Sequence, residues 1–154
     1  MLKNNLFNRK NKEQLNQLLE SEESERTICS FYRYINIANL NDIRNQLYTK
    51  LMKINVLGRI YIAKEGINAQ VSVPIPNWDN FVNIIESFSE FKSIHIKSAV
   101  IHSKSSFIKL IVKVKNKIVA DGLNDDSFIP SNVGTYLSAA DFNRAMDDPD
   151  SIVV

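Results

Sequence analysis

A set of polar and aromatic side chains alternates with apolar ones between Gly58 and Pro74. Arg59 and Tyr61 occupy every second position, and Asn68 and Gln70 do the same after a short break. Alternation with a period of two is typical of strands that bury one face and expose the other. A guanidinium, an aromatic ring and two amides bind by stacking and hydrogen bonding. This chemistry suits recognition of a single-stranded nucleic acid.

Residue types that catalyse reactions or bind metals are few and poorly spaced. Cys29 lies in the middle of a predicted strand, where a thiol is typically an inert core residue. His95 and His102 are seven residues apart in a stretch without acids, so no metal site is expected there. The three aspartates between positions 147 and 150 lack the ligand spacing and glycine of a calcium loop. We therefore expect no catalytic residue, metal site or cofactor in this chain.

Charge is segregated along the chain. Residues 13–25 contain five glutamates, residues 92–120 contain seven lysines and no acid, and residues 121–154 contain seven aspartates and one arginine. Clustered lysines bind polyanions well because counterions are released. An ordinary solvated surface would show the same pattern, so both interpretations stay open.

The hydrophobic pattern predicts an α+β domain. A short helix is expected at residues 12–19, a second from the N-cap Asn41 to about residue 55, and a third after the N-cap Asn77. Strands are expected at residues 27–34, 58–63, 67–74 and 107–119, with a short edge strand at 94–101. Gly66 would supply the positive φ of the turn in the 58–74 hairpin. This order predicts a ferredoxin-like split βαβ sandwich, with two helices on one face of an antiparallel sheet.

The other sheet face would collect the polar set. The phase of the first strand is ambiguous, so either Tyr32 and Tyr34 or Phe31 and Arg33 would lie on this face. Lys64 and Glu65 at the hairpin tip would contact a substrate or another domain, or simply be solvated. An ordinary half-exposed sheet explains the alternation equally well. The candidate binding residues are Tyr32, Arg33, Tyr34, Arg59, Tyr61, Lys64, Asn68, Lys109, Lys113, Lys115 and Lys117.

The C-terminal segment predicts the start of a further domain. Ser138 is a predicted N-cap, followed by a short helix with Phe142 and Met146 facing inward. After a turn at residues 149–150, residues 152–154 look like the beginning of a buried strand. We expect this segment to be cut off from its natural partners and poorly packed.

Composition is that of a soluble globular protein, with 44% hydrophobic and 23% charged residues. No apolar run approaches the roughly 20 residues of a membrane span, and the N-terminus lacks the apolar region of a secretory signal. A single cysteine excludes an internal disulfide and fits a reducing cytoplasm.

Several long segments carry a specific resemblance. They are SFYRY, GRIYIAKEGINAQVSVP, KVKNKIVADGL and NVGTYLSAADFNRAMDDPDSIVV, and they occur in this order. The chain resembles the N-terminal half of the bacterial rhodanese-related proteins that hydroxylate uridine in tRNA. The resemblance covers roughly residues 1–154. It implies an N-terminal helix and acidic link at 1–25, an acylphosphatase-like (ferredoxin-like) domain at 26–122, and at 123–154 a linker with the truncated start of a rhodanese-like α/β domain.

The resemblance also implies a function for the parent protein. That family makes 5-hydroxyuridine at the wobble position of tRNA, with molecular oxygen as co-substrate and a cysteine in the rhodanese-like domain, beyond Val154. The expected partners are the anticodon region of tRNA, bound by the candidate residues, and the C-terminal rhodanese-like domain. The fragment alone would be inactive. Two alternatives are a protein-interaction module and an acylphosphatase, although the loop at 35–40 lacks the glycine and arginine of a phosphate cradle.

Overall fold

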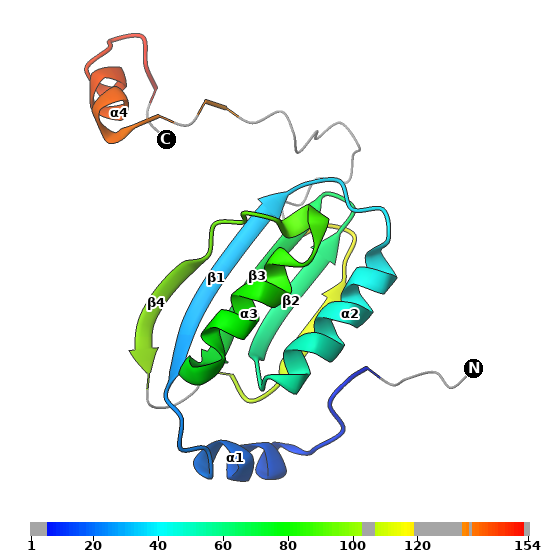
Figure 1. The fold of residues 1–154 in the computed structure, drawn as a ribbon. Coiled ribbons are helices and arrows are strands. Elements are labelled where there is room, and N and C mark those ends of the chain that lie inside the picture. Colours follow the sequence, from blue (N-terminus) through cyan, green and yellow to red (C-terminus); the bar gives the residue numbers. More distant parts are fainter. Residues whose placement is uncertain (1–5, 103–106, 119–133, 136, 153–154) are drawn as a thin grey trace.

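The computed structural model describes residues 6–102, 107–118, 134–135 and 137–152. Within these residues, the helices and all five predicted strands occur in the predicted order (Figure 1). The elements are α1 (Lys12–Glu20), β1 (Arg26–Tyr34), α2 (Leu40–Lys53), β2 (Leu57–Ala63), β3 (Gly66–Pro74), the 3₁₀ turn η1 (Ile75–Asn77), α3 (Trp78–Glu86), the 3₁₀ turn η2 (Ser89–Phe91), β4 (Lys97–His102), β5 (Leu110–Val114) and α4 (Ala139–Met146).

The sheet has the strand order β4-β1-β3-β2-β5. The first four strands pair antiparallel in the order of a ferredoxin-like fold. The expectation of a purely antiparallel sheet is wrong, because β5 pairs with β2 in parallel. The edge strand β4 is the fourth strand of the split βαβ unit, and β5 extends the opposite edge.

Both helices of this unit cover the same face of the sheet, as predicted (Figure 1). Ile43 and Leu47 of α2 join Phe81 and Ile85 of α3 in one buried cluster with alternate strand residues. The ring centroids of Phe31 and Phe81 lie 6.1 Å apart, so β1 packs directly beneath α3.

The hairpin between β2 and β3 has the predicted turn. Ala63 pairs with Gly66, leaving a two-residue connection. Gly66 has a φ of 150°, and a Cβ at this position would lie 2.0 Å from the backbone oxygen of Arg33. Only glycine therefore permits β1 to approach this closely.

Two predicted helix starts need correction or refinement. Helix α2 begins at Leu40 with Asn39 at the N-cap position, so Asn41 lies inside the helix and is not its cap. Asn77 does stand at the N-cap of α3, but its side chain donates to the backbone oxygen of Ile54 at 3.1 Å. It ties the two helices' ends together instead of capping its own helix.

The predicted strand at 107–119 is shorter than expected, because regular pairing ends at Val114. Lys115 N still donates to Ile62 O at 2.8 Å. The chain then bends, and the backbone N–H of Ile118 donates to the Glu65 carboxylate at 2.8 Å. This side-chain acceptor redirects the chain, and an alternating pattern of apolar and polar residues does not reveal it.

A buried arginine clamps the beginning of β1. Arg26 is 2% exposed. Its Nη1 donates to both carboxylate oxygens of Glu22 at 2.6 and 2.8 Å, and its Nε donates to Ser72 Oγ at 3.0 Å. Its Nη2 donates to the backbone oxygens of Ser72 and Asn55. The clamp joins the acidic segment after α1 to β3 and to the loop after α2.

The C-terminal helix forms where predicted, with the Ser138 hydroxyl accepting from Asp141 N. The expectation that Phe142 and Met146 face inward is wrong, because these side chains are 49% and 53% exposed. The apolar stripe exists, but nothing in the described part of the chain covers it. Ile152 is also exposed and belongs to no strand, while residues 153–154 lie outside the described residues.

Candidate nucleic-acid interface

The sheet face opposite α2 and α3 is called the open face here. It is formed by every second strand residue, and burial settles its phase on β1. Cys29 and Phe31 are 1% and 2% exposed on the helix side, whereas Tyr32 is 55% exposed. The open face therefore carries Tyr32 and Tyr34, not Phe31 and Arg33. Its central members are Ser30, Tyr32, Tyr34, Arg59, Tyr61, Asn68, Gln70, Lys97, Ile111 and Lys113, joined by Lys115 just past β5.

One cross-strand row gathers four of the predicted residues. Tyr32 pairs with Asn68, Asn68 with Tyr61, and Tyr61 with Lys113. Neighbouring strands are about 4.8 Å apart, so the side chains of one row stand side by side. Tyr32 and Lys113 are exposed, and Tyr61 and Asn68 are half-buried.

The next row on the same face lies two residues further along each strand. It joins Lys97, Ser30, Gln70, Arg59 and Ile111 across all five strands. Lys97, Gln70 and Arg59 are exposed. Sequence reasoning missed Lys97, because its position depends on the pairing of β1 with β4. That pairing contains a register shift between Thr27 and Cys29, which no sequence pattern signals.

Tyr61 is less available than its position suggests. The Nζ atom of Lys115 lies 5.5 Å from the centroid of the Tyr61 ring. An ammonium over an aromatic face is attracted by the ring quadrupole. Lys115 thus covers this ring and holds a positive charge above the row.

Asn68 is also engaged within the protein. Its Nδ2 donates to the backbone oxygen of Ile118 at 3.4 Å, and the Glu65 carboxylate accepts a hydrogen bond from the backbone N–H of Ile118. Ile118 is buried as a result. The segment after β5 therefore crosses one end of the open face and occupies the amide of Asn68.

Arg33 lies away from the other candidates. Its guanidinium donates to the backbone oxygens of Glu90, Lys92 and Ser93 at 3.3, 2.8 and 2.9 Å. These contacts hold the loop after α3 against β1, so Arg33 acts as a structural clamp on the helix side.

The remaining candidates surround the rows. Lys64 is exposed at the hairpin tip, and its carbonyl accepts from Ile37 N. Lys109 is exposed just before β5, Tyr34 is half-buried at the end of β1, and Lys117 is half-buried after β5. The structure thus brings together Tyr32, Arg59, Tyr61, Asn68, Lys113 and Lys115. It leaves the other predicted residues outside the two rows: Arg33, Tyr34, Lys64, Lys109 and Lys117.

Electrostatics distinguish the open face from the rest of the surface. None of the five described strands contains an aspartate or glutamate, whereas α2, α3 and η2 contain Asp42, Asp79, Glu86 and Glu90. Arg59, Lys97, Lys113 and Lys115 therefore act without acidic partners on the strands. Such an arrangement attracts a polyanion.

The Cys29 thiol is a poor nucleophile. It lies in the core, where loss of solvation raises the pKa of its thiol from 9.0 to about 12. The nucleophilic thiolate is therefore almost absent at neutral pH.

In the part of the chain that the structure describes, no group of three or more histidine, cysteine, aspartate or glutamate residues is arranged to hold a metal ion. Across the same residues, no helix is both long and apolar enough to span a membrane.

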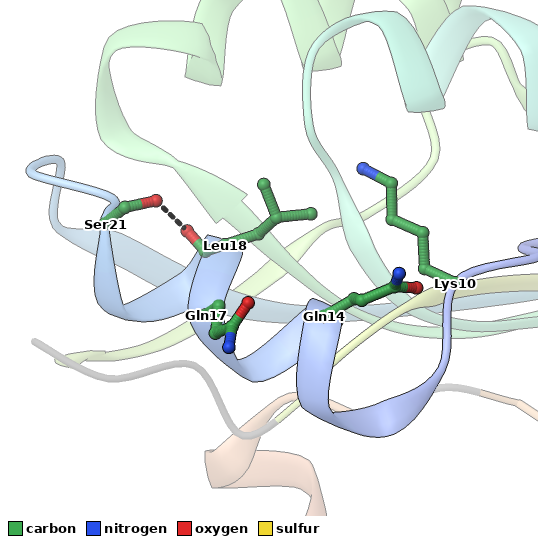
Figure 2. Close-up of a pocket in the computed structure, with 5 residues that line it drawn as sticks. All are labelled: Lys10, Gln14, Gln17, Leu18 and Ser21. Carbon is green, nitrogen blue, oxygen red and sulfur yellow. Dashed lines mark hydrogen bonds between the residues drawn. The ribbon is translucent and has the colours of Figure 1, made fainter.

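Three of the shallow hollows in the described structure border helix α1. Figure 2 shows the first, of about 400 Å³, where the Ser21 hydroxyl donates to the backbone oxygen of Leu18 at 2.9 Å. It offers amides, a hydroxyl and one amine, from Lys10, Gln14, Gln17, Leu18 and Ser21. The second, of about 360 Å³, lies between α1 and the end of the sheet and is lined mainly by leucines, with the ion pair of Glu22 and Arg26 at its side.

The loop between β1 and α2 does not form a phosphate cradle. The backbone N–H groups of Ile35 and Ile37 donate to Glu65 O and Lys64 O, both at 2.9 Å. Ile37 is fully buried. Two amides that an acylphosphatase would direct at phosphate are thus bound to the hairpin tip, and the loop supplies no arginine.

Comparison with known proteins adds independent information. The UPF0176 acylphosphatase like domain matches residues 26–118, from the first residue of β1 to the buried Ile118. The "tRNA uridine(34) hydroxylase" of Leptospira interrogans is 51% identical over 149 residues, and the protein of the same name from Yersinia pestis is 41% identical over 150 residues. Both alignments cover 97% of this chain but only 41% and 42% of the relatives.

Among solved structures, the BLUF protein BlrB matches with a TM-score of 0.42 at 11% identity, covering 59% of this chain and 74% of BlrB. The sequence similarities are far stronger. The chain spans about two fifths of the length of the curated relatives it matches, and corresponds to their N-terminal part. With the domain match extending through the whole sheet, the chain belongs to the UPF0176 acylphosphatase-like domain family.

Proposed function

We propose that this chain is the N-terminal part of an enzyme that hydroxylates the wobble uridine of tRNA. The observation that carries this proposal is the 41–51% identity to proteins named tRNA uridine(34) hydroxylase, sustained over 97% of the chain. The parent enzyme would form 5-hydroxyuridine with molecular oxygen as co-substrate. A tRNA substrate favours the cytoplasm as its compartment.

In this proposal the chain binds substrate and the chemistry belongs to the rest of the parent. The only thiol of the chain is buried with a raised pKa, which makes Cys29 a poor nucleophile. The active-site cysteine would come from a rhodanese-like domain, of which residues 123–154 would be the linker and the beginning. The exposed Phe142 and Met146 of α4 fit a helix that packs within that domain.

The open face is the proposed tRNA surface. Its cations lie on or next to strands that contain no acid, which suits phosphates, and its exposed Tyr32 and Gln70 suit unpaired nucleotides such as those of an anticodon loop. A surface for packing the rest of the parent is the second candidate. Lysine is depleted in protein interfaces, so Lys97, Lys113 and Lys115 favour RNA.

The test uses the parent enzyme. Under oxygen it should convert wobble uridine of unmodified tRNA to hydroxyuridine, measured by mass spectrometry of nucleosides. The double substitution Lys113→Glu and Lys115→Glu should raise KM for tRNA more than it lowers kcat, because it removes phosphate contacts and no reacting group. A parent that leaves tRNA uridine unchanged would refute the proposal. An unchanged KM would assign the open face to domain packing.

A further inference from the structure

Tyr32 is unusual among the aromatic residues of this domain. It lies in β1, which is flanked by β4 and β3, yet 55% of its surface is exposed. Within the described residues, the Tyr32 side chain makes no hydrogen bond and no contact with another ring or with a cation. A large aromatic ring left bare in the interior of a sheet is a surface on which another planar group can stack.

The other ring of the same row is already covered. Lys115 lies over Tyr61, and Asn68 between the two tyrosines gives its amide N–H to Ile118 O. Tyr32 is therefore the ring of this row whose face is accessible to a ligand. We expect it, in place of Tyr61, to provide the stacking surface. The occupied amide of Asn68 also means that this row has little capacity to read the edge of a base.

Charge surrounds Tyr32 on both sides. Lys97 of β4 pairs with Ser30, the neighbour of Tyr32 on the same face, and on the other side Arg59 and Lys113 stand beyond β3. All three cations are exposed. A nucleic-acid strand crossing the sheet would find a phosphate contact before and after the ring.

We propose that Tyr32 stacks one unpaired base of a single-stranded RNA segment, with the flanking phosphates on Lys97 and on Arg59 or Lys113. Every base has a π-face, so this contact tolerates any sequence, and recognition of a particular uridine falls to the rest of the parent. This inference rests on the proposed function, because it names the part of tRNA that the open face holds.

The experiment measures binding of the 154-residue chain to two probes of equal length, a fluorescein-labelled single-stranded RNA and a blunt RNA duplex. Base stacking contributes about 1–3 kcal/mol, so Tyr32→Ala should weaken single-strand binding about 5- to 150-fold. Tyr32→Phe keeps the ring and should bind like the wild type. Duplex binding should be the same for all three proteins, whereas Lys113→Glu should weaken binding to both probes.

A spectroscopic readout separates stacking from a structural role. In a tyrosine-labelled sample, the Tyr32 ring protons should move upfield when single-stranded RNA is added and stay unchanged with duplex. Equal single-strand affinity for Tyr32→Ala and wild type would overturn the inference. If Lys113→Glu still weakened binding, the proposed tRNA function would survive that result. If no variant affected RNA binding, both the stacking inference and the proposed tRNA function would fail. Weaker binding of the Tyr32→Ala chain to the rest of the parent protein would then identify the open face as a packing surface.

Discussion

On β2, Ile60 and Ile62 are fully buried beneath the helices, whereas their neighbours Arg59 and Tyr61 point to the other side of the sheet. The helix side and the open face are thus built from the same strands, one residue apart. The helix side excludes water and holds the fold together. The open face carries cations and a bare ring, and it contributes little packing. Because successive side chains of a strand point to opposite faces, the residues that stabilise the fold and the residues proposed to bind RNA lie on different faces of the sheet. Substitutions on the helix side should therefore lower stability, whereas substitutions on the open face should change binding.

The largest effect is expected on the helix side. Phe81 is fully buried and packs against Phe31 and Trp78, with ring centroids at 6.1 and 5.6 Å. Phe81→Ala should lower the free energy of unfolding by about 4 kcal/mol, through lost apolar burial and the cavity that remains. Urea denaturation followed by circular dichroism measures this change. Tyr32→Ala is the matched control and should cost less than about 0.5 kcal/mol; similar losses for both would contradict the division between the faces.

The Arg26 clamp shows that a buried charged residue also stabilises the fold. Arg26→Ala leaves Glu22 and the backbone oxygens of Ser72 and Asn55 without their donor. Removing one member of a fully buried ion pair costs about 3 kcal/mol or more; because the Glu22 side chain is partly exposed, we expect a loss of about 2–3 kcal/mol here. Thermal unfolding would measure it, with Arg59→Ala on the exposed surface as the control. An Arg26→Ala protein as stable as Arg59→Ala would show that the clamp is unimportant.

Cys29 reports how well the helix side excludes water. Its pKa is about 12 in the folded protein and 9.0 when solvated, so above pH 9 the unfolded chain loses a proton that the folded chain keeps. The folded state then becomes less stable relative to the unfolded state as pH rises from 9 towards 12. Between pH 8 and pH 10 the wild type should lose about 1.4 kcal/mol more than Cys29→Ala. Equal pH dependence of the two proteins would mean that solvent reaches the thiol.

The sequence predicts the helix side well for a physical reason. Burial imposes strong periods on the chain, and residues such as Ile43, Leu47, Phe81 and Ile85 reveal both helices and their common face. The hairpin can be predicted from the sequence equally well, because Gly66 indicates the turn and the alternation of apolar and polar residues on either side indicates the strands. The polar members of β2 and β3 could be placed on one face for the same reason.

Other features depend on pairing, which a period does not encode. The parallel contact of β5 with β2 and the position of Lys97 both follow from strand register. Arg33 could not be separated from Tyr32 by pattern, because polar and apolar types alternate poorly along β1. The Glu65 contact to Ile118 joins residues 53 positions apart and leaves no local signal.

The most direct test of the account is the salt dependence of tRNA binding to the 154-residue chain. Four cations of the open face, Arg59, Lys97, Lys113 and Lys115, should give a slope near −3 in log K against log salt, with a Kd of about 10⁻⁴ to 10⁻⁶ M. Lys113→Glu with Lys115→Glu should make the slope shallower by about 1.5 and leave stability within about 0.5 kcal/mol. The control with the same change in net charge, Lys53→Glu with Lys92→Glu, alters exposed lysines outside the open face and should bind with nearly the wild-type slope. Binding that is insensitive to salt, or equal weakening by both double variants, would contradict the assignment of the open face as the RNA surface.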